Sequence, residues 1–507
     1  MTQRATWLAK VIRFLSGSRP RPHQRRRLLL EVLEDRTVPT TITPTTFADG
    51  VLGSGSLRDA VLQFNADTGT GGDTIQLAAG TYSLTIQNVG GHHETAGQTG
   101  DLNLTQASHH WIIQGAGSSG ANATIIDAGQ LQDRVFDIVT PGTQVVFQDL
   151  VIQGGLAQDD GSDGALAGTT DALGGGILNN GGDVTLDHVV VQNNVARAGD
   201  AVSLGTTGHN SRGGALYSTG GALTMTGATL ADNQAIGGRG GDNDGFRHVG
   251  DGGSASGAGL YATGGSLDIS GSMIVRNRAT GGRAGDGGSY TNHTRSGSIT
   301  IIYLGGRGGG AQGGGLYVTG GSLTVTSSTI GSNQGNGGSA GLYGVGGTGA
   351  GGGVYVGGGS LTIASSTIGS NQGNGGPGDG YEGPGQGGGL YNSGTVTISD
   401  STLSGNSSTT SLDGTSAGSG GGIYNSGTLT VRNSTLSGNS AIGYHSGAGG
   451  ISNSGTLTVS NTIIAGNLAG SAPDLSGNLG SEGHNLIGNT QGSSGFDSTD
   501  LLNVNPI

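Results

Sequence analysis

The chain has 507 residues, of which 112 are glycine, only 4 % are aromatic and only 11 % are charged, so ordinary globular domains are not expected. It has no cysteine, which excludes disulfides and thiolate metal sites, and no run of 18 apolar residues, so no transmembrane helix is expected. The net charge of −13 is unevenly spread, because residues 1–36 contain nine basic and three acidic residues and the remainder contains 12 basic and 31 acidic ones; that acidic body should repel nucleic acid.

The first 40 residues differ in composition from the rest, and we expect a basic leader at 1–40 that is disordered or partly helical. Its apolar stretch WLAKVIRFL is broken by Lys10 and Arg13, which argues against an ordinary signal peptide. The stretch RRRLLLEVLEDRTVP is similar to basic tags at the start of large bacterial surface and secreted repeat proteins, which implies export or sorting. The alternatives are a basic amphipathic helix on the inner face of a membrane and, disfavoured by the acidic body, nucleic-acid binding through the arginines at 25–27.

The stretch SLRDAVLQFNAD (56–67) is the one convincing helix after the leader. Ser56 and Asp59 have capping-box spacing, and Leu57, Val61 and Phe64 lie on one apolar stripe. After it, strand-like runs separated by glycine turns occur at 73–85, 110–117, 123–129 and 143–155. We therefore expect a helical cap followed by roughly three irregular coils, together spanning 45–170.

From residue 174 the chain consists of repeats that begin with GG-x-apolar and end with apolar-x-x-Asn. The units have nearly the same length, whereas the segments that link them vary severalfold in length. A constant unit with variable links indicates one structural repeat per unit, with loops that leave from one edge. The eight units are 174–194, 213–233, 257–277, 313–333, 351–371, 387–406, 420–439 and 448–467.

Apolar residues alternate with polar ones inside each unit, as Val396 and Ile398 do around Thr397. This period of two predicts strands, and in the unit at 387–406 we place them at 389–391, 395–399 and around 402–403. The Asn-Ser-Gly or Thr-Gly-Gly between the first two strands should supply a turn with positive φ. Such a unit cannot close a core alone, but coils stacked about 4.8 Å apart can pair strand to strand as a parallel solenoid.

Two residue types recur at fixed positions of the units. We interpret the closing asparagines as a structural ladder of amide hydrogen bonds between coils; they are Asn194, Asn233, Asn277, Asn333, Asn371, Asn406, Asn439 and Asn467. A tyrosine should face outward beside the inward apolar residue, either as a bracing stack or as a platform for sugar rings; these are Tyr217, Tyr261, Tyr317, Tyr355, Tyr391 and Tyr424.

Catalytic constellations are sparse in the repeats. A carbohydrate-cleaving β-helix needs paired acids, or acids with an arginine, and we treat Arg276 and Arg432 as isolated. Two acidic loops are weak calcium candidates, through Asp159, Asp160, Asp163, Asp242 and Asp244, although solvated loops are the simpler interpretation. The pairs His92-His93, followed by Glu94, and His109-His110 should point to opposite faces of a strand and are poor metal ligands. No cofactor is otherwise expected.

The segment GSLRDAVLQFNADTGTGGDTIQLAAGTYSLT resembles the CSLREA-type segment that precedes many bacterial parallel β-helix proteins, with Gly55 at the cysteine position and Asp59 at the glutamate. The GG-x-apolar … x-x-Asn units resemble repeats of the polymorphic outer-membrane protein family, with Leu, Ile or Val where that family often has Phe. Together the resemblances cover about 54–490 and imply a right-handed β-helix, of the pectin lyase-like kind, at the cell surface. They imply little about activity.

We therefore expect an all-β, right-handed parallel β-helix of about 11 or more coils over 41–507, with regular repeats at 174–467 and glycine-rich insertions. Because Leu501, Leu502 and Val504 form an apolar run, 468–507 should be an incomplete coil that continues into further sequence or is covered by a partner. The expected function is that of a non-enzymatic, adhesin-like or envelope structural protein, extracellular or at the cell surface, with a protein or glycan partner. The alternative is a β-helix that binds or cleaves polysaccharide, for which acids of the early coils would have to converge with an arginine within about 6 Å.

Overall fold

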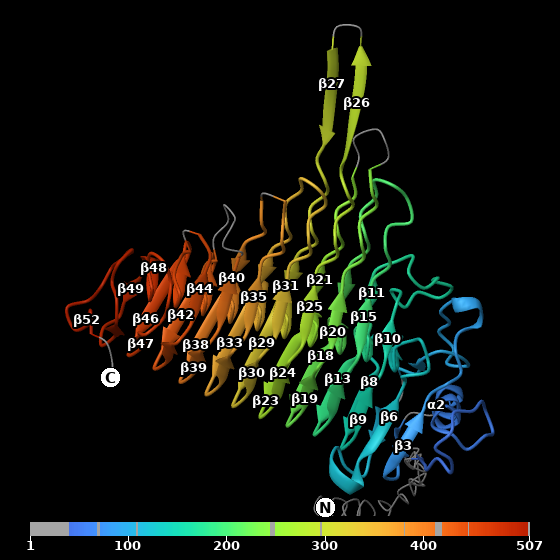
Figure 1. Cartoon of the computed structure of the whole chain (residues 1–507). Coiled ribbons are helices and arrows are strands. Elements are labelled where there is room, and N and C mark those ends of the chain that lie inside the picture. The colour runs from blue at the N-terminus through green and yellow to red at the C-terminus, as the bar shows by residue number, and fades with distance from the viewer. Residues whose placement is uncertain are drawn as a thin grey trace, which may run out of the picture. The chain divides into compact units, whose positions relative to one another are not determined.

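The computed structural model describes residues 40–504, apart from 68–70, 108–109, 244–248, 295–296, 380, 411–417 and 445. The predicted leader at 1–40, except Thr40, lies outside the described residues. Residues 39–507 form one compact unit, a stack of parallel coils (Figure 1). No helix in the described part of the chain is long and apolar enough to cross a membrane.

Four sheets of parallel strands, with 23, 13, 8 and 6 strands, run along the stack, which confirms the predicted parallel β-helix. Each regular coil gives sheet 1 two strands, or one continuous strand in the coils at 316–326 and 354–364, and gives sheet 2 one strand. The 13 strands of sheet 2 correspond to 13 coils, in agreement with the prediction of about 11 or more. These 13 strands are β3 (Gly80–Ser83), β6 (Thr124–Asp127), β9 (Val151–Gln153), β14 (Val190–Gln192), β19 (Thr229–Ala231), β24 (Met273–Val275), β30 (Thr329–Gly331), β34 (Thr367–Gly369), β39 (Thr402–Ser404), β43 (Thr435–Ser437), β47 (Ile463–Ile464), β50 (Leu486–Ile487) and β52 (Leu501–Leu502).

Sheet 1 is the widest face and has 23 strands. They are β1 (Thr41–Ile42), β2 (Gly72–Gln76), β4 (Leu102–Leu104), β5 (His110–Gln114), β7 (Phe136–Ile138), β8 (Gln144–Gln148), β12 (Ile177–Asn179), β13 (Asp183–Asp187), β17 (Leu216–Thr219), β18 (Ala222–Thr226), β22 (Leu260–Thr263), β23 (Ser266–Ser270), β29 (Leu316–Thr326), β33 (Val354–Ala364), β37 (Leu390–Asn392), β38 (Thr395–Ser399), β41 (Ile423–Asn425), β42 (Thr428–Arg432), β45 (Ile451–Asn453), β46 (Thr456–Ser460), β48 (Leu475–Asn478), β49 (Gly480–Ser481) and β51 (Ser493–Ser494).

The links between units are more ordered than loops, because most of them begin with a strand of an 8-stranded sheet 3 and end with a strand of a 6-stranded sheet 4. Sheet 3 contains β10 (Leu156–Ala157), β15 (Val195–Arg197), β20 (Gln234–Ile236), β25 (Arg278–Thr280), β31 (Gln334–Asn336), β35 (Gln372–Asn374), β40 (Ser407–Thr409) and β44 (Ser440–Ile442). Sheet 4 contains β11 (Ala172–Leu173), β16 (Ser211–Arg212), β21 (Ala255–Ser256), β28 (Ala311–Gln312), β32 (Gly349–Ala350) and β36 (Gly385–Gln386).

Alternate side chains of each strand point into the core, so the core is filled with few large residues. In β37 and β38 the inward residues Leu390, Val396 and Ile398 are fully buried. Each pairs with an equivalent apolar residue of the next coil, as Val396 does with Leu429. The interior therefore consists of columns of Leu, Ile and Val, and the backbone bonds between coils supply regularity.

The two types of turn in sheet 1 differ. In Thr-Gly-Gly turns both glycines have positive φ, as at Gly220 (68°) and Gly221 (66°), in agreement with the prediction. The Asn-Ser-Gly turn at 392–394 has no residue with positive φ, so that part of the prediction is wrong. There the side-chain oxygen of Asn392 accepts a hydrogen bond from the backbone N–H of Gly394 at 2.9 Å, and this side-chain bond forms the turn.

The first coil is covered by the predicted helix, α2 (Leu57–Ala66). The hydroxyl of Ser56 accepts from the N–H of Asp59 at 3.0 Å. The Asp59 carboxylate accepts from the N–H groups of Gly53 and Gly55, rather than from that of Ser56 as in a capping box. Phe64 packs edge-on against the buried Trp111 of β5, with ring centroids 5.6 Å apart, and so closes the end of the core. Two 3₁₀ turns, Val89–Gly91 and Gly120–Asn122, lie in the early coils.

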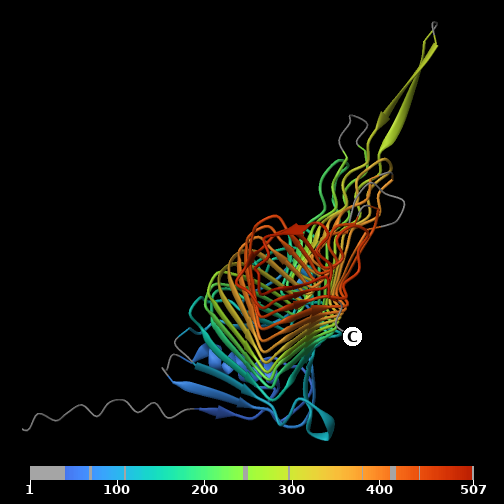
Figure 2. The ribbon, with the colours of Figure 1, turned by 90° about the vertical axis from the view of Figure 1, so that its left-hand side faces the viewer.

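A glycine blade rises from one side of the stack and is tallest at the antiparallel hairpin β26 (Gly288–Thr294) and β27 (Gly297–Tyr303) (Figures 1 and 2). We use the name glycine blade for the described residues of 198–210, 237–254, 281–310, 337–348 and 375–384. Its segments are joined sideways by backbone hydrogen bonds, for example from Gly282 to Gly253 and from Gly309 to Gly282. The bonds recur at every third residue, as from Gly237 to Thr280 and from Gly240 to Arg283, which is the period of a polyproline II chain.

Glycine is required where these segments touch. A methyl carbon added at Gly309 would lie 2.0 Å from the carbonyl oxygen of Gly253, and one at Gly282 would lie 1.9 Å from that of Gly238. Both contacts are with backbone, which cannot turn aside as a side chain can. The glycine-rich links are therefore a packed layer, and their composition reflects the close approach of neighbouring chains.

We expect Gly309→Ala to loosen the blade, because the added carbon forces adjacent backbones apart at a cost of about 1–3 kcal/mol. Hydrogen exchange at the amides of Gly282, Gly309 and Gly338 should accelerate, while sheets 1 and 2 keep their protection. Gly310→Ala is the matched control, since its added carbon comes no closer than 3.8 Å to the nearest atom. Equal exchange in the two variants would contradict the packed-blade description.

Candidate functional site

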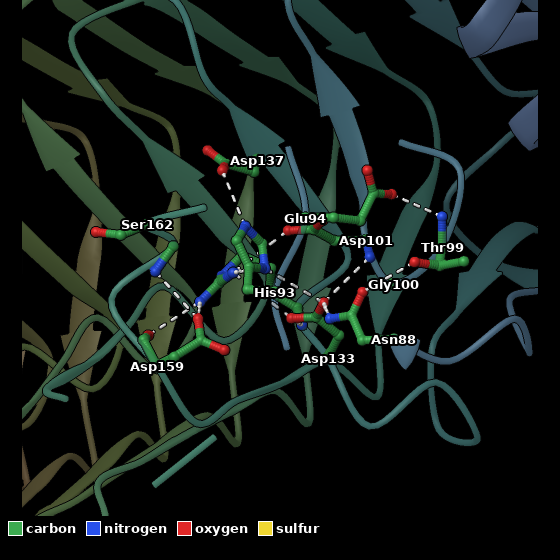
Figure 3. Close-up of polar contacts among 12 residues, drawn as sticks. Asn88, His93, Glu94, Thr99, Gly100, Asp101, Asp133, Asp137, Asp159 and Ser162 are labelled. Carbon is green, nitrogen blue, oxygen red and sulfur yellow. Dashed lines mark hydrogen bonds and ion pairs between the residues drawn. The ribbon is translucent and has the colours of Figure 1, made fainter. Parts of the chain in front are cut away.

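Six charged residues from the early coils converge in a buried cluster, and Figure 3 labels five of them. Their side chains are at most 6 % exposed. Asp101 precedes β4, Asp133 and Arg134 precede β7, and Asp137 lies in β7; the other two come from loops and are His93 and Asp159. We call this set the buried charge cluster.

Arg134 is the centre of the cluster. Its Nη2 lies 2.6 Å from Asp159 Oδ1, and its Nη1 lies 3.4 Å from Asp101 Oδ2 and 3.5 Å from Asp133 Oδ1. Nη2 also donates to the carbonyl of Asp159, and Nε donates to that of Leu173. Burial opposes the charged form of Arg134, but the nearby carboxylates outweigh it, so the pKa of Arg134 is raised. The guanidinium thus ties together three successive coils.

His93 lies between two carboxylates, with Nδ1 3.6 Å from Asp133 Oδ2 and Nε2 3.8 Å from Asp137 Oδ2. Burial is the largest single influence and opposes its charged form, but the interactions with Asp133, Asp137 and Asp101 together outweigh it and raise the pKa of His93 to about 10. His93 therefore carries a positive charge at neutral pH. It forms the second cation of the cluster.

The pKa values of Asp101 and Asp133 are shifted by their surroundings. Burial and the neighbouring carboxylate of Asp133 raise the pKa of Asp101 well above its usual range. Burial also opposes the charged form of Asp133, but Arg134 and His93 outweigh it, so the pKa of Asp133 is lowered. The pKa values of these two neighbouring carboxyls are therefore shifted in opposite directions.

A second buried pair continues the cluster toward the cap. Arg58 of α2 bonds through Nε to Asp49 Oδ1 at 2.9 Å, and both side chains are fully buried. The remaining donors of Arg58 reach the carbonyls of Gly97, Gly100 and Asp101. Together the two arginines attach the cap and the 84–101 excursion to the first coils.

The cluster offers a three-ligand set for a metal ion, yet Arg134 already occupies the position of a cation. His93, Asp101 and Asp133 each have one ligand atom within 4.8 Å of the others. Arg134 Nη1 lies 3.2 Å from His93 Nδ1 and within 3.5 Å of both carboxylates. A metal ion there would be repelled by the guanidinium, so these residues fit an arginine rather than a metal. The sequence did not single out His93 for this role, because its acidic partners belong to other segments of the chain.

The distance criterion for a polysaccharide-cleaving site is met, since acids of the early coils do converge with an arginine. A cleaving site must also be accessible to its substrate, and this cluster is not. Asp101, Asp137 and Arg134 are completely buried, and Asp133 and Asp159 are nearly so. A polymer cannot reach them in the folded protein. The arrangement is therefore suited to joining coils, and not to acting on a chain.

The calcium candidates do not form one site in the described residues. Asp159 pairs with Arg134, and Asp160 accepts from the N–H of Ser162. Asp163 is exposed at a loop tip. Asp242 lies in the blade, 2.5 Å from Arg239, and Asp244 lies outside the described residues. Of the paired histidines, His92 is exposed and His93 buried; His110 is exposed, and His109 lies outside the described residues.

Arg276 and Arg432 are not isolated, contrary to the prediction. Arg276 pairs with Asp232 of the preceding coil at 2.8 Å, and Arg432 pairs with Glu482 at 3.2 Å. These two ion pairs are exposed and contribute little to stability. They involve acids that lie 44 and 50 residues away in the chain, which no local pattern reveals.

The eight closing asparagines lie in one buried column. Each donates from its backbone N–H and from Nδ2 to the side-chain oxygen of the next, as Asn333 does to Asn371 at 3.0 Å in both bonds. The left-handed residue of the turn is the one before the asparagine, for example Ser370 (57°), and not the asparagine itself. The column ends at Asp474, whose carboxylate accepts both bonds from Asn467.

The asparagine column explains the glycines that open each unit. A carbon added at Gly353 would lie 2.9 Å from the Asn371 side chain, and one at Gly389 would lie 3.0 Å from that of Asn406. The start and end of a unit are therefore packed against each other. A second column was not predicted from the sequence; in it each serine N–H donates to the next hydroxyl, as Ser328 does to Ser366 and Ser366 to Ser401.

The six tyrosines of the units form one stack on the outer face of sheet 1. Neighbouring ring centroids are 4.6–5.2 Å apart, and the ring planes are within 12° of parallel. Both faces of each inner ring are therefore covered by other rings, and only the ring edges face solvent. A sugar cannot stack on the inner rings, so a platform role is restricted to the outer faces of Tyr217 and Tyr424.

No family model, curated protein or solved structure matches this chain. Its fold is that of a parallel β-helix solenoid, established by its strand pairing. The resemblances to CSLREA-type segments and to outer-membrane protein repeats remain motif resemblances.

Proposed function

We propose that this protein is a non-enzymatic scaffold, extracellular or at the cell surface, that contacts a partner protein through the glycine blade. The observation that carries the proposal is a set of exposed apolar residues on consecutive blade segments. Leu304 is 68 % exposed, Leu342 48 %, Tyr343 44 % and Tyr381 59 %. We call these four residues the blade rim.

The blade rim is held as one surface by backbone bonds between its segments. Gly305, next to Leu304, donates to the carbonyl of Leu342, and Gly346 donates to that of Tyr381. The N–H of Tyr343 donates to the Asp379 carboxylate at 3.1 Å. Large apolar side chains gathered at the edge of a rigid projection favour a protein contact, because their burial against a partner removes apolar area from water. The resemblance of the repeats to surface proteins supports the proposed location.

The test uses the labelled full-length chain and intact cells of the producing organism. Antibodies to the chain should label unpermeabilised cells, and added protein should bind to their surface. The variant L304S/L342S/Y343S/Y381S should lose at least tenfold in binding. The control M273S/I463S changes two exposed apolar residues on the outer face of sheet 2 and should bind as the parent does. Loss in both variants, or in neither, would refute the rim as the contact.

Polysaccharide binding is the second candidate function, favoured by an uncharged hydroxyl array on the outer face of sheet 1. The array occupies two columns over five consecutive coils, paired residue by residue. Its members are Ser322, Thr324, Ser360, Thr362, Thr395, Thr397, Thr428, Thr430, Thr456 and Thr458. On a glycan array, binding that is lost in T397K/T430K and kept in the rim variant would favour this candidate over the first.

A further inference from the structure

The tyrosine stack brings together six of the 12 tyrosines, one from each of six consecutive coils. Tyr217 pairs with Tyr261, Tyr261 with Tyr317, and so on to Tyr424, each as the direct partner in the parallel ladder. The stack ends where Leu178 and Ser452 occupy the equivalent positions. It is an array of phenols that differ little in height or tilt.

The spacing within the stack is uneven. The centroids of Tyr261 and Tyr317, and those of Tyr355 and Tyr391, are 4.6 Å apart, with planes within 5° of parallel. The pair between them, Tyr317 and Tyr355, is at 4.9 Å, and the two outermost pairs are at 5.1 and 5.2 Å. Because equivalent residues of parallel strands face each other, the carbons beside the hydroxyl of one ring lie opposite those of the next.

The outer edges of the rings are only partly covered. Tyr261 is 9 % exposed and the other five are half-buried, on a face of sheet 1 that no other sheet covers. The guanidinium of Arg212 lies 5.8 Å from the Tyr261 ring centroid. The ring torsion of tyrosine is broad, so two rings can turn toward each other and reach the carbon–carbon bond length of about 1.5 Å.

We propose that the stack is a site of oxidative cross-linking, in which a peroxidase-type one-electron oxidant joins adjacent tyrosines as dityrosine. Each phenol loses one electron and one proton. The two phenoxyl radicals then form one carbon–carbon bond between the ring carbons next to the oxygens. The hydrogen on each of these carbons moves to its own oxygen, which restores the phenols, and hydrogen peroxide is reduced to two waters.

The geometry selects the pairs that join. The two closest pairs, Tyr261–Tyr317 and Tyr355–Tyr391, share no member and can both react. A link between Tyr261 and Tyr317 closes a loop that contains the hairpin of β26 and β27, and a link between Tyr355 and Tyr391 closes a full coil of the stack. Both links restrict the unfolded chain as a disulfide does. The result would be a stack whose middle coils are covalently joined.

The experiment treats dilute full-length chain with peroxidase and hydrogen peroxide, and separately with a small photochemical one-electron oxidant. Dityrosine fluorescence should appear in the monomer fraction. Peptide mapping should place most links at the two closest pairs, and the linked protein should unfold at a higher denaturant concentration. Links that form only with the small oxidant would still support the proposal, and would show that the peroxidase cannot reach the stack.

The matched variant Y261F/Y317F/Y355F/Y391F keeps the stacked rings and removes four hydroxyls. It should show less than a tenth of the intramolecular dityrosine of the parent, with unchanged circular dichroism before oxidation. The control Y343F/Y381F/Y444F removes three exposed tyrosines outside the stack and should leave the intramolecular links unchanged. If neither oxidant links the stack, or if the links join only exposed tyrosines of different molecules, the proposal is overturned.

Discussion

Replacing Arg134 with Met should destabilise the first coils by about 3–5 kcal/mol, the range for breaking a buried ion pair. The variant keeps an unbranched but shorter side chain and leaves the buried acids Asp101, Asp133 and Asp159 without their guanidinium. The buried acids would then lack their main compensating cation. Hydrogen exchange in β4, β7 and β9 should accelerate by at least a hundredfold, and the early coils should lose structure at a lower temperature than the rest.

Two further variants distinguish a buried charge effect from general damage. Arg276→Met removes an exposed guanidinium that pairs with Asp232 and should cost no more than about 1 kcal/mol. Adding Asp133→Asn and Asp159→Asn to Arg134→Met removes part of the uncompensated charge and should recover part of the loss. If Arg134→Met and Arg276→Met have equal effects, the cluster does not hold the coils together.

The second large effect is expected for Asn371→Leu, in the middle of the asparagine column. The substitution removes the acceptor of two bonds from Asn333 and the donor of bonds to Ile330 and Asn406. Each buried donor or acceptor left without a partner costs about 1–3 kcal/mol. The larger side chain would also press against Gly353. Thermal unfolding and hydrogen exchange should show weakening of the coils at 316–406.

Thr367→Leu is the control for this change, because it places leucine at an exposed position of β34 in the same coil. It should unfold within about 0.5 kcal/mol of the parent. Stability of Asn371→Leu equal to that of the control would show that the column contributes order without measurable free energy.

The strands of the regular units could be predicted from the sequence alone. The alternation of Val396, Thr397 and Ile398 has the period of a strand, and β38 (Thr395–Ser399) has the predicted bounds. The column of asparagines and the column of tyrosines follow from the same repeat, because residues at equivalent positions of stacked coils must become neighbours. The cap helix is equally local, since its cap residue and its apolar stripe lie within the single short segment 56–67.

The short strands of sheets 3 and 4 could not be predicted, because strands of two or three residues are too short to show a period. β4 and β7 were not predicted either, because their alternation, Leu102–Leu104 and Phe136–Ile138, extends over only three residues. The charged pattern Asp133-Arg134…Asp137 in an apolar run was the one signal of an interior cluster. Only the stacking of the coils shows that His93, Asp101 and Asp159 lie beside Asp133, Arg134 and Asp137.

The sequence by itself determined that this chain stacks strands as a parallel solenoid with polar columns, because every feature of that inference repeats at short range. The tertiary structure alone decided what the glycine-rich links do and where the charges meet. Glycine signals conformational freedom in a sequence, whereas in the blade it permits backbones to approach within hydrogen-bonding distance. Arg276 is exposed, whereas Arg134 lies among buried acids. This difference depends on contacts with residues of other coils. Such contacts form only when the coils are stacked.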